Sequence, residues 1–289
     1  MFEKKYIIEP DPPKAMDINV YIEKRDFEYR ALLENDQAGE LLFQSFFERN
    51  PAYLPGAFEV LGESGHYPFM NCLISQPKIS DERIRIPDFM WLANDSLSFC
   101  PVFIEIEKPS KKQFRQDEVN RAEFTQAYNQ INEWRAILST PSGQESFYDR
   151  FSIDNRTRQK VFKPQYVLVY GRRSEYENNE WLRKKRALIQ QSDCVIMSFD
   201  RLQASRDVFD LVTCKVSNGI YNVLHIPPTF VYRPATASVL KDFNGFSSAI
   251  SRIPDISDER RAFLQARFDY WMEYGKNDNL GILNAGDFE

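Results

Sequence analysis

The stretch IRIPDFMWLANDSLSFCPVFIEIEKPS, residues 84–110, decides the fold. Residues 84–92 and 102–107 are rich in β-branched and aromatic side chains, and a polar break at 94–96 separates them. This pattern predicts two antiparallel strands joined by a short loop.

Three carboxylates lie inside these apolar strands: Asp88, Glu105 and Glu107. Burying a carboxylate is costly unless something pairs with it. Side chains alternate across a strand, so Glu105 and Glu107 share a face, and a turn between Ser96 and Leu97 would place Asp88 opposite Glu105. Oxygen ligands of this kind suit Mg²⁺ or Mn²⁺, which can activate water and stabilise charge on a phosphodiester.

The order Pro-Asp, hairpin, Glu-x-Glu-Lys-Pro resembles the PD-(D/E)XK nuclease superfamily, and with its surroundings the chain resembles the Shedu antiphage nucleases. The resemblance extends in scattered motifs over residues 36–211. It implies an α/β (α+β) fold with a restriction-endonuclease-like core, in which helices flank a mixed β-sheet. It also implies cleavage of DNA with Mg²⁺ and a role in bacterial defence against phage. The motif is short, and Ile-Pro-Asp recurs at 253–255 without an acidic strand after it.

The chain departs from the superfamily at the third motif position, which usually holds lysine. Here Glu107 occupies that position, and Lys108 comes one residue later, on the opposite strand face. A third carboxylate strengthens metal binding but removes a cation near the scissile phosphate. Glu107 is therefore expected to be a metal ligand or the general base, unless a bulge brings Lys108 into its place.

Two predicted helices flank the acidic strands. The first covers residues 36–50 and carries Glu40, a metal ligand by resemblance or a solvated acid favoured by the helix dipole. The second covers 117–138 by its apolar spacing and carries Gln130. The run from Gln130 to Trp134 resembles a Gln-x-x-x-Tyr motif, so Gln130 is expected to orient substrate or water. The alternative is an ordinary polar residue of an amphipathic helix.

A basic run follows the acidic strand directly. We expect it to contact the phosphates of DNA, although such runs are also common in solvated loops. Its members are Lys108, Lys111, Lys112 and Arg115.

Composition limits the other classes. The chain has 289 residues, 43% hydrophobic, a net charge of −5, four cysteines without a CxxC pair and two histidines, which makes a Cys/His zinc site unexpected. The absence of a signal peptide and of an 18-residue apolar run predicts a cytoplasmic protein without membrane contact. Whether it forms a homo-oligomer stays open.

The rest of the chain gives coarser predictions. We expect an N-terminal cap at 1–34, a nuclease domain at 35–212 and an extension at 213–289 packed on the core. The expected helices are 176–191 and 257–274. The expected strands are 5–8, 18–22, 57–61, 71–76, 166–170, 194–198, 220–224 and 229–232.

The sequence thus favours a metal-dependent DNA endonuclease in which Asp88 and Glu105 bind the ion. The first rival is a nucleic-acid-binding or regulatory protein on a decayed nuclease fold, which would not bind Mn²⁺. The second is a glycosidase with paired carboxylates, which would work in EDTA.

Overall fold

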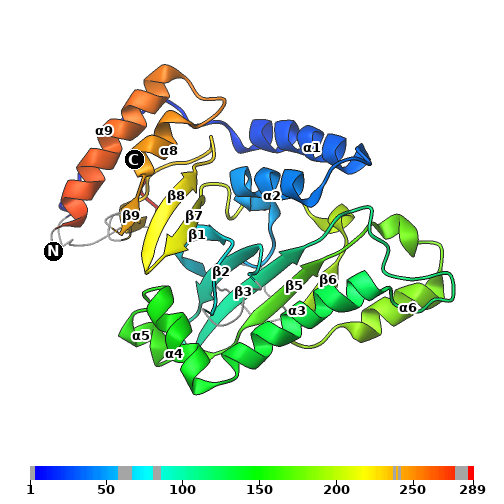
Figure 1. Ribbon diagram of the computed structural model, residues 1–289. Helices are drawn as coiled ribbons and strands as arrows, with labels where there is room; N and C mark the ends of the chain where they lie inside the picture. Colours follow the sequence, from blue (N-terminus) through cyan, green and yellow to red (C-terminus); the bar gives the residue numbers. More distant parts are fainter. Residues whose placement is uncertain (1–3, 58–66, 81–85, 237–238, 240–241, 277–285) are drawn as a thin grey trace.

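The computed structural model describes residues 4–57, 67–80, 86–236, 239, 242–276 and 286–289. Its centre is a mixed sheet in the order β6-β5-β3-β2-β1-β7-β8-β9, with β4 also paired to β3 (Figure 1). The strands are β1 (Tyr67–Ser75), β2 (Phe89–Asn94), β3 (Ser98–Ile106), β4 (Val161–Phe162), β5 (Gln165–Val169), β6 (Cys194–Met197), β7 (Val212–Ser217), β8 (Ile220–His225) and β9 (Phe243–Asn244).

Helices cover both faces of this sheet. They are α1 (Ile18–Glu34), α2 (Glu40–Arg49), α3 (Ala122–Leu138), α4 (Pro141–Arg150), α5 (Asn155–Arg158), α6 (Glu180–Ile189), α8 (Phe246–Ser251) and α9 (Asp258–Gly275). In Figure 1, α1 and α2 lie above the central strands and α3 lies below them. The chain is therefore the mixed α/β protein that the sequence predicted. Within its described part, every helix is too short or too polar to span a bilayer.

The two faces follow from strand alternation. Met90 of β2 and Phe103 of β3 belong to the larger core, which also contains the buried side of α3. Phe89 and Trp91 point the other way, into the core shared with α1 and α2. Because both faces are covered, β3 is buried along its whole length.

The register of the central hairpin confirms the prediction from sequence. β2 and β3 are antiparallel, with Phe89 opposite Ile104 and Asn94 opposite Phe99. One further step in the same register brings position 88 to position 105. The hairpin therefore turns between residues 96 and 97, as expected. Of the predicted strand 84–92, residues 84–85 lie outside the described part of the chain. Residues 86–88 form no strand, and the ladder begins at Phe89, after Pro87, which has no N–H to donate.

The N-terminal strand predictions are wrong where the structure describes them. Residues 5–8 form no strand, and residues 18–22 open α1, whose N-cap Asp17 accepts the N–H groups of Asn19 and Val20. The β-branched residues at 18–22 suggested a strand, but they form the start of a helix that buries Tyr21 and Tyr29. The predicted strand 57–61 lies almost wholly outside the described residues.

Both helices beside the acidic strands begin later than predicted. α2 starts at Glu40, four residues after the predicted start at Asp36, with Gly39 as its N-cap. α3 starts at Ala122, because residues 113–121 form a tight loop in which Arg115 and Arg121 donate their N–H groups to Val119 and Gln113. Tertiary contacts of this loop override the helical pattern of the sequence.

The predictions for the later strands and helices are only partly confirmed. Strands β1, β5, β6 and β8 and helix α9 confirm the predictions, and α6 is shorter than the predicted 176–191. Residues 229–232 are not a strand; β8 pairs instead with β7 across the turn Asn218-Gly219, in which both residues have positive φ. An Asn-Gly turn between β-rich segments is a strong hairpin signal, which the sequence reading missed. The predicted domain boundary at 212/213 falls within β7, which pairs in parallel with β1.

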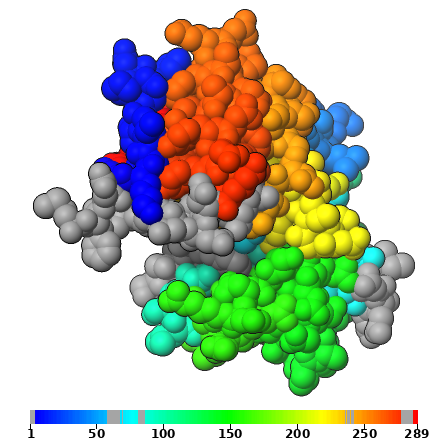
Figure 2. Space-filling view, turned by 90° about the vertical axis from the view of Figure 1, so that its left-hand side faces the viewer, coloured from blue at the N-terminus to red at the C-terminus, as the bar shows by residue number. Residues whose placement is uncertain are grey.

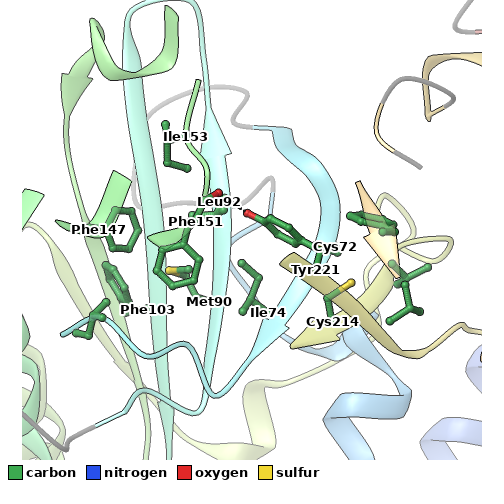
Figure 3. Close-up of a cluster of buried hydrophobic side chains, with 14 of the residues drawn as sticks. Cys72, Ile74, Met90, Leu92, Phe103, Phe147, Phe151, Ile153, Cys214 and Tyr221 are labelled. Carbon is green, nitrogen blue, oxygen red and sulfur yellow. Dashed lines mark hydrogen bonds between the residues drawn. The ribbon is translucent and has the colours of Figure 1, made fainter. Parts of the chain in front are cut away.

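The larger core joins the central and the C-terminal strands. Figure 3 shows Met90, Phe103 and Phe147 packed beside Ile74 and Tyr221, whose hydroxyl donates to the carbonyl of Phe151 at 2.8 Å. The four cysteines are buried and unbridged.

Figure 2 shows the N-terminal segment lying across α9. There the ring of Tyr6 contacts Trp271, and the N–H of Ile7 donates to the hydroxyl of Tyr270 at 2.6 Å.

Candidate metal centre

Asp88 and Glu105 lie side by side at the end of the central hairpin. The register aligns their positions on adjacent strands, and their side chains project to the α3 face. Oδ2 of Asp88 accepts the backbone N–H of Ile106 at 2.7 Å, which fixes the carboxylate against β3. Glu105 is only 7% exposed. The pair of carboxylates that the sequence predicted is thus held by the sheet itself, with Glu105 buried and Asp88 partly buried.

Within the described residues, only one of the two carboxylate oxygens of Glu105 has a hydrogen-bond partner. Its Oε1 accepts the amide Nε2 of Gln130 at 2.6 Å. Its Oε2 is buried and has no hydrogen-bond partner among the described residues. A buried oxygen without a partner loses its hydration without compensation. Such an atom marks a place where a proton or a cation would be stabilised.

The carboxylates perturb one another. Burial, and then the charges of Glu40 and Glu107, raise the pKa of Asp88 to about 8, although the N–H of Ile106 opposes the shift. Burial, followed by the charges of Asp88 and Glu107, raises the pKa of Glu105 well above its usual range. Negative charge in a small, poorly hydrated volume produces both shifts. A divalent cation would reverse them by neutralising the carboxylates.

Glu107 directly follows β3 and is paired with a lysine. It is 8% exposed, its N–H donates to the carbonyl of Val169 at 3.0 Å, and its carboxylate forms an ion pair with Lys111. The cation nearest to the third motif position is therefore Lys111, four residues after it, rather than Lys108, whose side chain is exposed. No sequence pattern in the motif itself points to Lys111 in this position.

Glu40 reaches the same group of charges from the opposite helix. It is the first residue of α2 and is partly buried. Burial and then the charge of Glu107 raise its pKa, whereas Lys111 and, to a smaller extent, Lys108 lower it. The structure thus brings Glu40 into the electrostatic environment of Asp88 and Glu105, as the sequence prediction required. Its role as a ligand stays a prediction.

The acidic centre offers only part of a ligand set for a metal ion. Among the residues that the structure describes, no three Asp, Glu, His or Cys side chains form a group that could hold one. Asp88 is turned to Ile106, and Glu107 is turned to Lys111. The pair Asp88–Glu105 has oxygen ligands, and Glu105 Oε2 accepts no hydrogen bond from the described part of the chain, so the pair fits a hard cation such as Mg²⁺ or Mn²⁺.

The basic run lies beside this centre but is not uniform. Lys108 and Lys112 are exposed, Lys111 pairs with Glu107, and Arg115 pairs with Asp117 at 2.9 Å. Of the four basic residues predicted to contact DNA, Lys111 and Arg115 are therefore engaged in ion pairs with carboxylates of the chain.

A buried polar frame, which the sequence analysis did not find, holds the basic run in place. The carboxylate of Glu175 accepts the N–H groups of Gln113 at 2.9 Å and Phe114 at 2.8 Å. Arg186 of α6 is 5% exposed and donates to the side chain of Gln113 and to the carbonyl of Tyr170. Buried Arg and Gln at long sequence separation leave no local signal.

The second Ile-Pro-Asp is structural. Asp255 has a positive φ of 59° and pairs with Arg25 at 2.5 Å on the surface, far in sequence from any acidic strand. The tripeptide alone therefore does not define the centre.

The chain was compared with known proteins. Residues 38–203 match the protein-family model described as Shedu protein SduA, C-terminal. Comparison with curated proteins and with solved structures gave no significant match. The matched segment contains α2, the acidic hairpin, α3 and β5. Because it spans more than half of the 289 residues, the chain belongs to the Shedu family, which is associated with antiphage defence.

Proposed function

We propose that this protein is a metal-dependent DNA endonuclease that acts in antiphage defence, with a PD-(D/E)XK core built from α2, the acidic hairpin, α3 and β5. The observation that carries the proposal is the pair of partly buried Asp88 and buried Glu105, which share one face of adjacent strands, with Glu105 Oε2 lacking a hydrogen-bond partner among the described residues. Two neighbouring carboxylates whose pKa values are raised by burial and by nearby negative charge make a candidate functional site.

In this proposal Asp88 and Glu105 hold Mg²⁺ or Mn²⁺, and Glu107 and Glu40 complete the acidic surroundings. A bound ion of this kind would supply an activated water and stabilise charge on the phosphodiester. Gln130 orients the Glu105 carboxylate through its 2.6 Å hydrogen bond. Glu107 serves as a ligand or as the base that accepts the proton of the attacking water.

Lys111 takes the role that the motif lysine has elsewhere. Its ammonium group is already inside the acidic centre, paired with Glu107, and also acts on Glu40. When substrate enters, a phosphate competes with Glu107 for this lysine. Glu107 would then be free to act as a metal ligand, so one exchange of ion pairs would supply both the missing ligand and the missing cation.

The direct test is cleavage of plasmid DNA with Mg²⁺, with Mn²⁺ and with EDTA. We expect cleavage only with a divalent ion, and a loss of at least about a hundredfold in Asp88→Asn and in Glu105→Gln, since each removes a charged ligand. The matched control is Glu145→Gln, an exposed carboxylate on α4 that pairs with Arg158. Cleavage by either site variant at the rate of the wild-type protein would refute the assignment, and activity in EDTA would favour a metal-free hydrolase.

A second candidate function is a nucleic-acid-binding or regulatory protein on a decayed nuclease fold. The ion pair between Glu107 and Lys111 and the lack of a three-ligand group among the described residues favour it. The two candidates differ in metal affinity. Calorimetric titration with Mn²⁺ should give binding that Asp88→Asn abolishes if the centre is active, and no binding to the wild-type protein if it is decayed.

A further inference from the structure

A pocket of about 280 Å³ lies next to the acidic centre, between the basic run and the start of α3. Since a water molecule occupies roughly 30 Å³ of liquid, the pocket has room for a phosphate group together with several waters. Its lining residues are Ser110, Lys111, Lys112, Arg121, Glu123 and Tyr170.

Tyr170 gives this pocket an unsatisfied donor. Its side chain is fully buried, and its hydroxyl forms no hydrogen bond with any residue that the structure describes. The ring is fixed by edge-to-face packing on Phe124 at 5.1 Å, and the backbone of Tyr170 is tied to Met197 and Arg186. A rigid, buried hydroxyl without a partner normally indicates a missing ligand or water.

The start of α3 adds further donors. This helix has 17 residues, and its N-cap, Arg121, makes no side-chain capping bond, so the first N–H groups of the helix are left for an outside acceptor. The positive end of the helix dipole points in the same direction. Anions are the preferred ligands of such a helix end.

The pocket is lined by three cationic side chains and one carboxylate, and these differ in how they are paired. Arg121 donates through Nε to the carbonyl of Phe114 at 3.1 Å, and neither Arg121 nor Lys112 forms an ion pair with a described residue. Lys111 is shared with Glu107 of the acidic centre. Glu123, in the first turn of α3, opposes an anion. The balance favours an anion that can accept several hydrogen bonds at once.

We propose that this pocket binds a phosphate group, held by Arg121, Lys112, the hydroxyl of Tyr170 and the first N–H groups of α3. That the phosphate belongs to DNA rests on the proposed function. Gln130 follows Glu123 by seven residues, which is about 10 Å along a helix. The bound phosphate would therefore lie a few nucleotides from the one at Asp88 and Glu105, and the pocket would set the register of the strand on the enzyme.

Binding is measured in EDTA, so that it does not depend on metal or on cleavage. Inorganic phosphate is titrated by calorimetry, and fluorescent single-stranded oligonucleotides with and without a 5′-phosphate are titrated by anisotropy. The variants are Arg121→Ala, Tyr170→Phe, which keeps the ring on Phe124, and Glu123→Gln. The control is Arg156→Ala, an exposed arginine on α5. Thermal melts confirm that each variant is folded.

We expect the wild-type protein to bind phosphate, with affinity about tenfold lower in Arg121→Ala, severalfold lower in Tyr170→Phe, severalfold higher in Glu123→Gln and unchanged in the control. Tighter binding of the 5′-phosphorylated oligonucleotide would identify a terminal phosphate as the ligand, and equal binding of both would identify a backbone phosphodiester. The proposal is overturned if the wild-type protein does not bind phosphate, or if folded Arg121→Ala and Tyr170→Phe bind it as the wild type does. Because no cleavage is measured, the nuclease assignment and this pocket succeed or fail separately.

Discussion

Protonation of Asp88 and Glu105 makes the stability of the fold depend on pH, because the pKa values of both carboxyl groups are raised in the folded protein. The pKa of Asp88 rises from 3.8 to about 8 on folding, and that of Glu105 also rises, mainly because burial removes water from the carboxylates. Below about pH 4 the contribution of this proton to stability is fully present. As the pH rises toward 8, the unfolded chain gives up a proton that the folded chain retains, so the contribution is lost.

The first prediction concerns this pH dependence. Without divalent ions, the free energy of unfolding of the wild-type protein should fall between pH 5 and pH 8, by at most about 1.4 kcal/mol per pH unit for each proton retained. Asp88→Asn should show a flatter profile and equal or higher stability at pH 8. Urea unfolding at several pH values measures both. Parallel profiles for the two proteins would contradict the raised pKa of Asp88.

The second prediction concerns Glu107, the residue at which the chain departs from the superfamily motif. If Glu107 is a ligand or base, Glu107→Gln should lose most cleavage activity, at least about tenfold, because the amide keeps the size but not the charge or the basicity. Glu107→Lys should then lose activity as well, and also repel Lys111.

Plasmid cleavage under the same conditions measures all variants. If Glu107 is a decayed lysine position, Glu107→Lys should instead raise activity while Glu107→Gln changes little. The exchange of ion pairs proposed above also requires Lys111→Ala to lose much more activity than Lys108→Ala. Equal losses in these two variants would argue against a special role for Lys111.

At the scale of elements, the loop after β3 is fixed by its contact with the end of β5. Gly171 has a φ of +65°, and a Cβ atom there would lie 2.6 Å from the carbonyl oxygen of Lys111. Only glycine allows this close approach of two backbones. The approach holds Lys111 beside Glu107, so the geometry of the centre depends on a residue that carries no functional group.

The third prediction is that Gly171→Ala both destabilises the protein, by about 1–3 kcal/mol, and lowers cleavage, because backbone strain and the contact with Lys111 displace the loop. Chemical denaturation and the plasmid assay measure the two effects. Gly39→Ala is the matched control, since a Cβ atom there meets nothing within 4 Å. Wild-type activity in a stable Gly171→Ala would separate this contact from the site.

At the scale of the whole molecule, segments far apart in sequence meet at one buried arginine. Arg260 of α9 is 1% exposed and donates to Glu289 at 2.6 Å, to the carbonyl of Pro13 at 2.7 Å and to the carbonyl of Phe230 at 2.8 Å. The N–H of Glu289 donates in turn to the carbonyl of Tyr232 at 2.7 Å. These bonds fasten both ends of the described chain to the C-terminal helices.

The fourth prediction is that Glu289→Gln lowers the free energy of unfolding by about 3–5 kcal/mol, because it leaves the charge of Arg260 buried without a counterion. Guanidinium unfolding measures the loss. The control is Glu273→Gln, which removes an exposed ion pair with Lys276 and should change stability little. Cleavage per folded molecule should be unchanged in both, since this cluster belongs to α9 and to loop residues and includes none of the residues of β2, β3 or α3.

The sequence by itself determined the central hairpin and its acidic face. Alternation in two short strands was enough to place Asp88 opposite Glu105, because the side-chain period of a strand is fixed and a short loop leaves few registers. The long helix α9 and its Ser257 N-cap also followed from local signals, which propensity and capping supply without tertiary contacts.

Only the tertiary structure decided what surrounds the acidic hairpin. Local pattern suggested a strand at 18–22, where packing on α2 and the sheet makes a helix, and it began α3 five residues too early, where the frame of Glu175 and Arg186 holds a loop instead. The ion pair of Glu107 with Lys111 and the pocket at Tyr170 could not be predicted from the sequence either. Both depend on side chains that meet across separate elements, and contacts of that kind have no period along the chain.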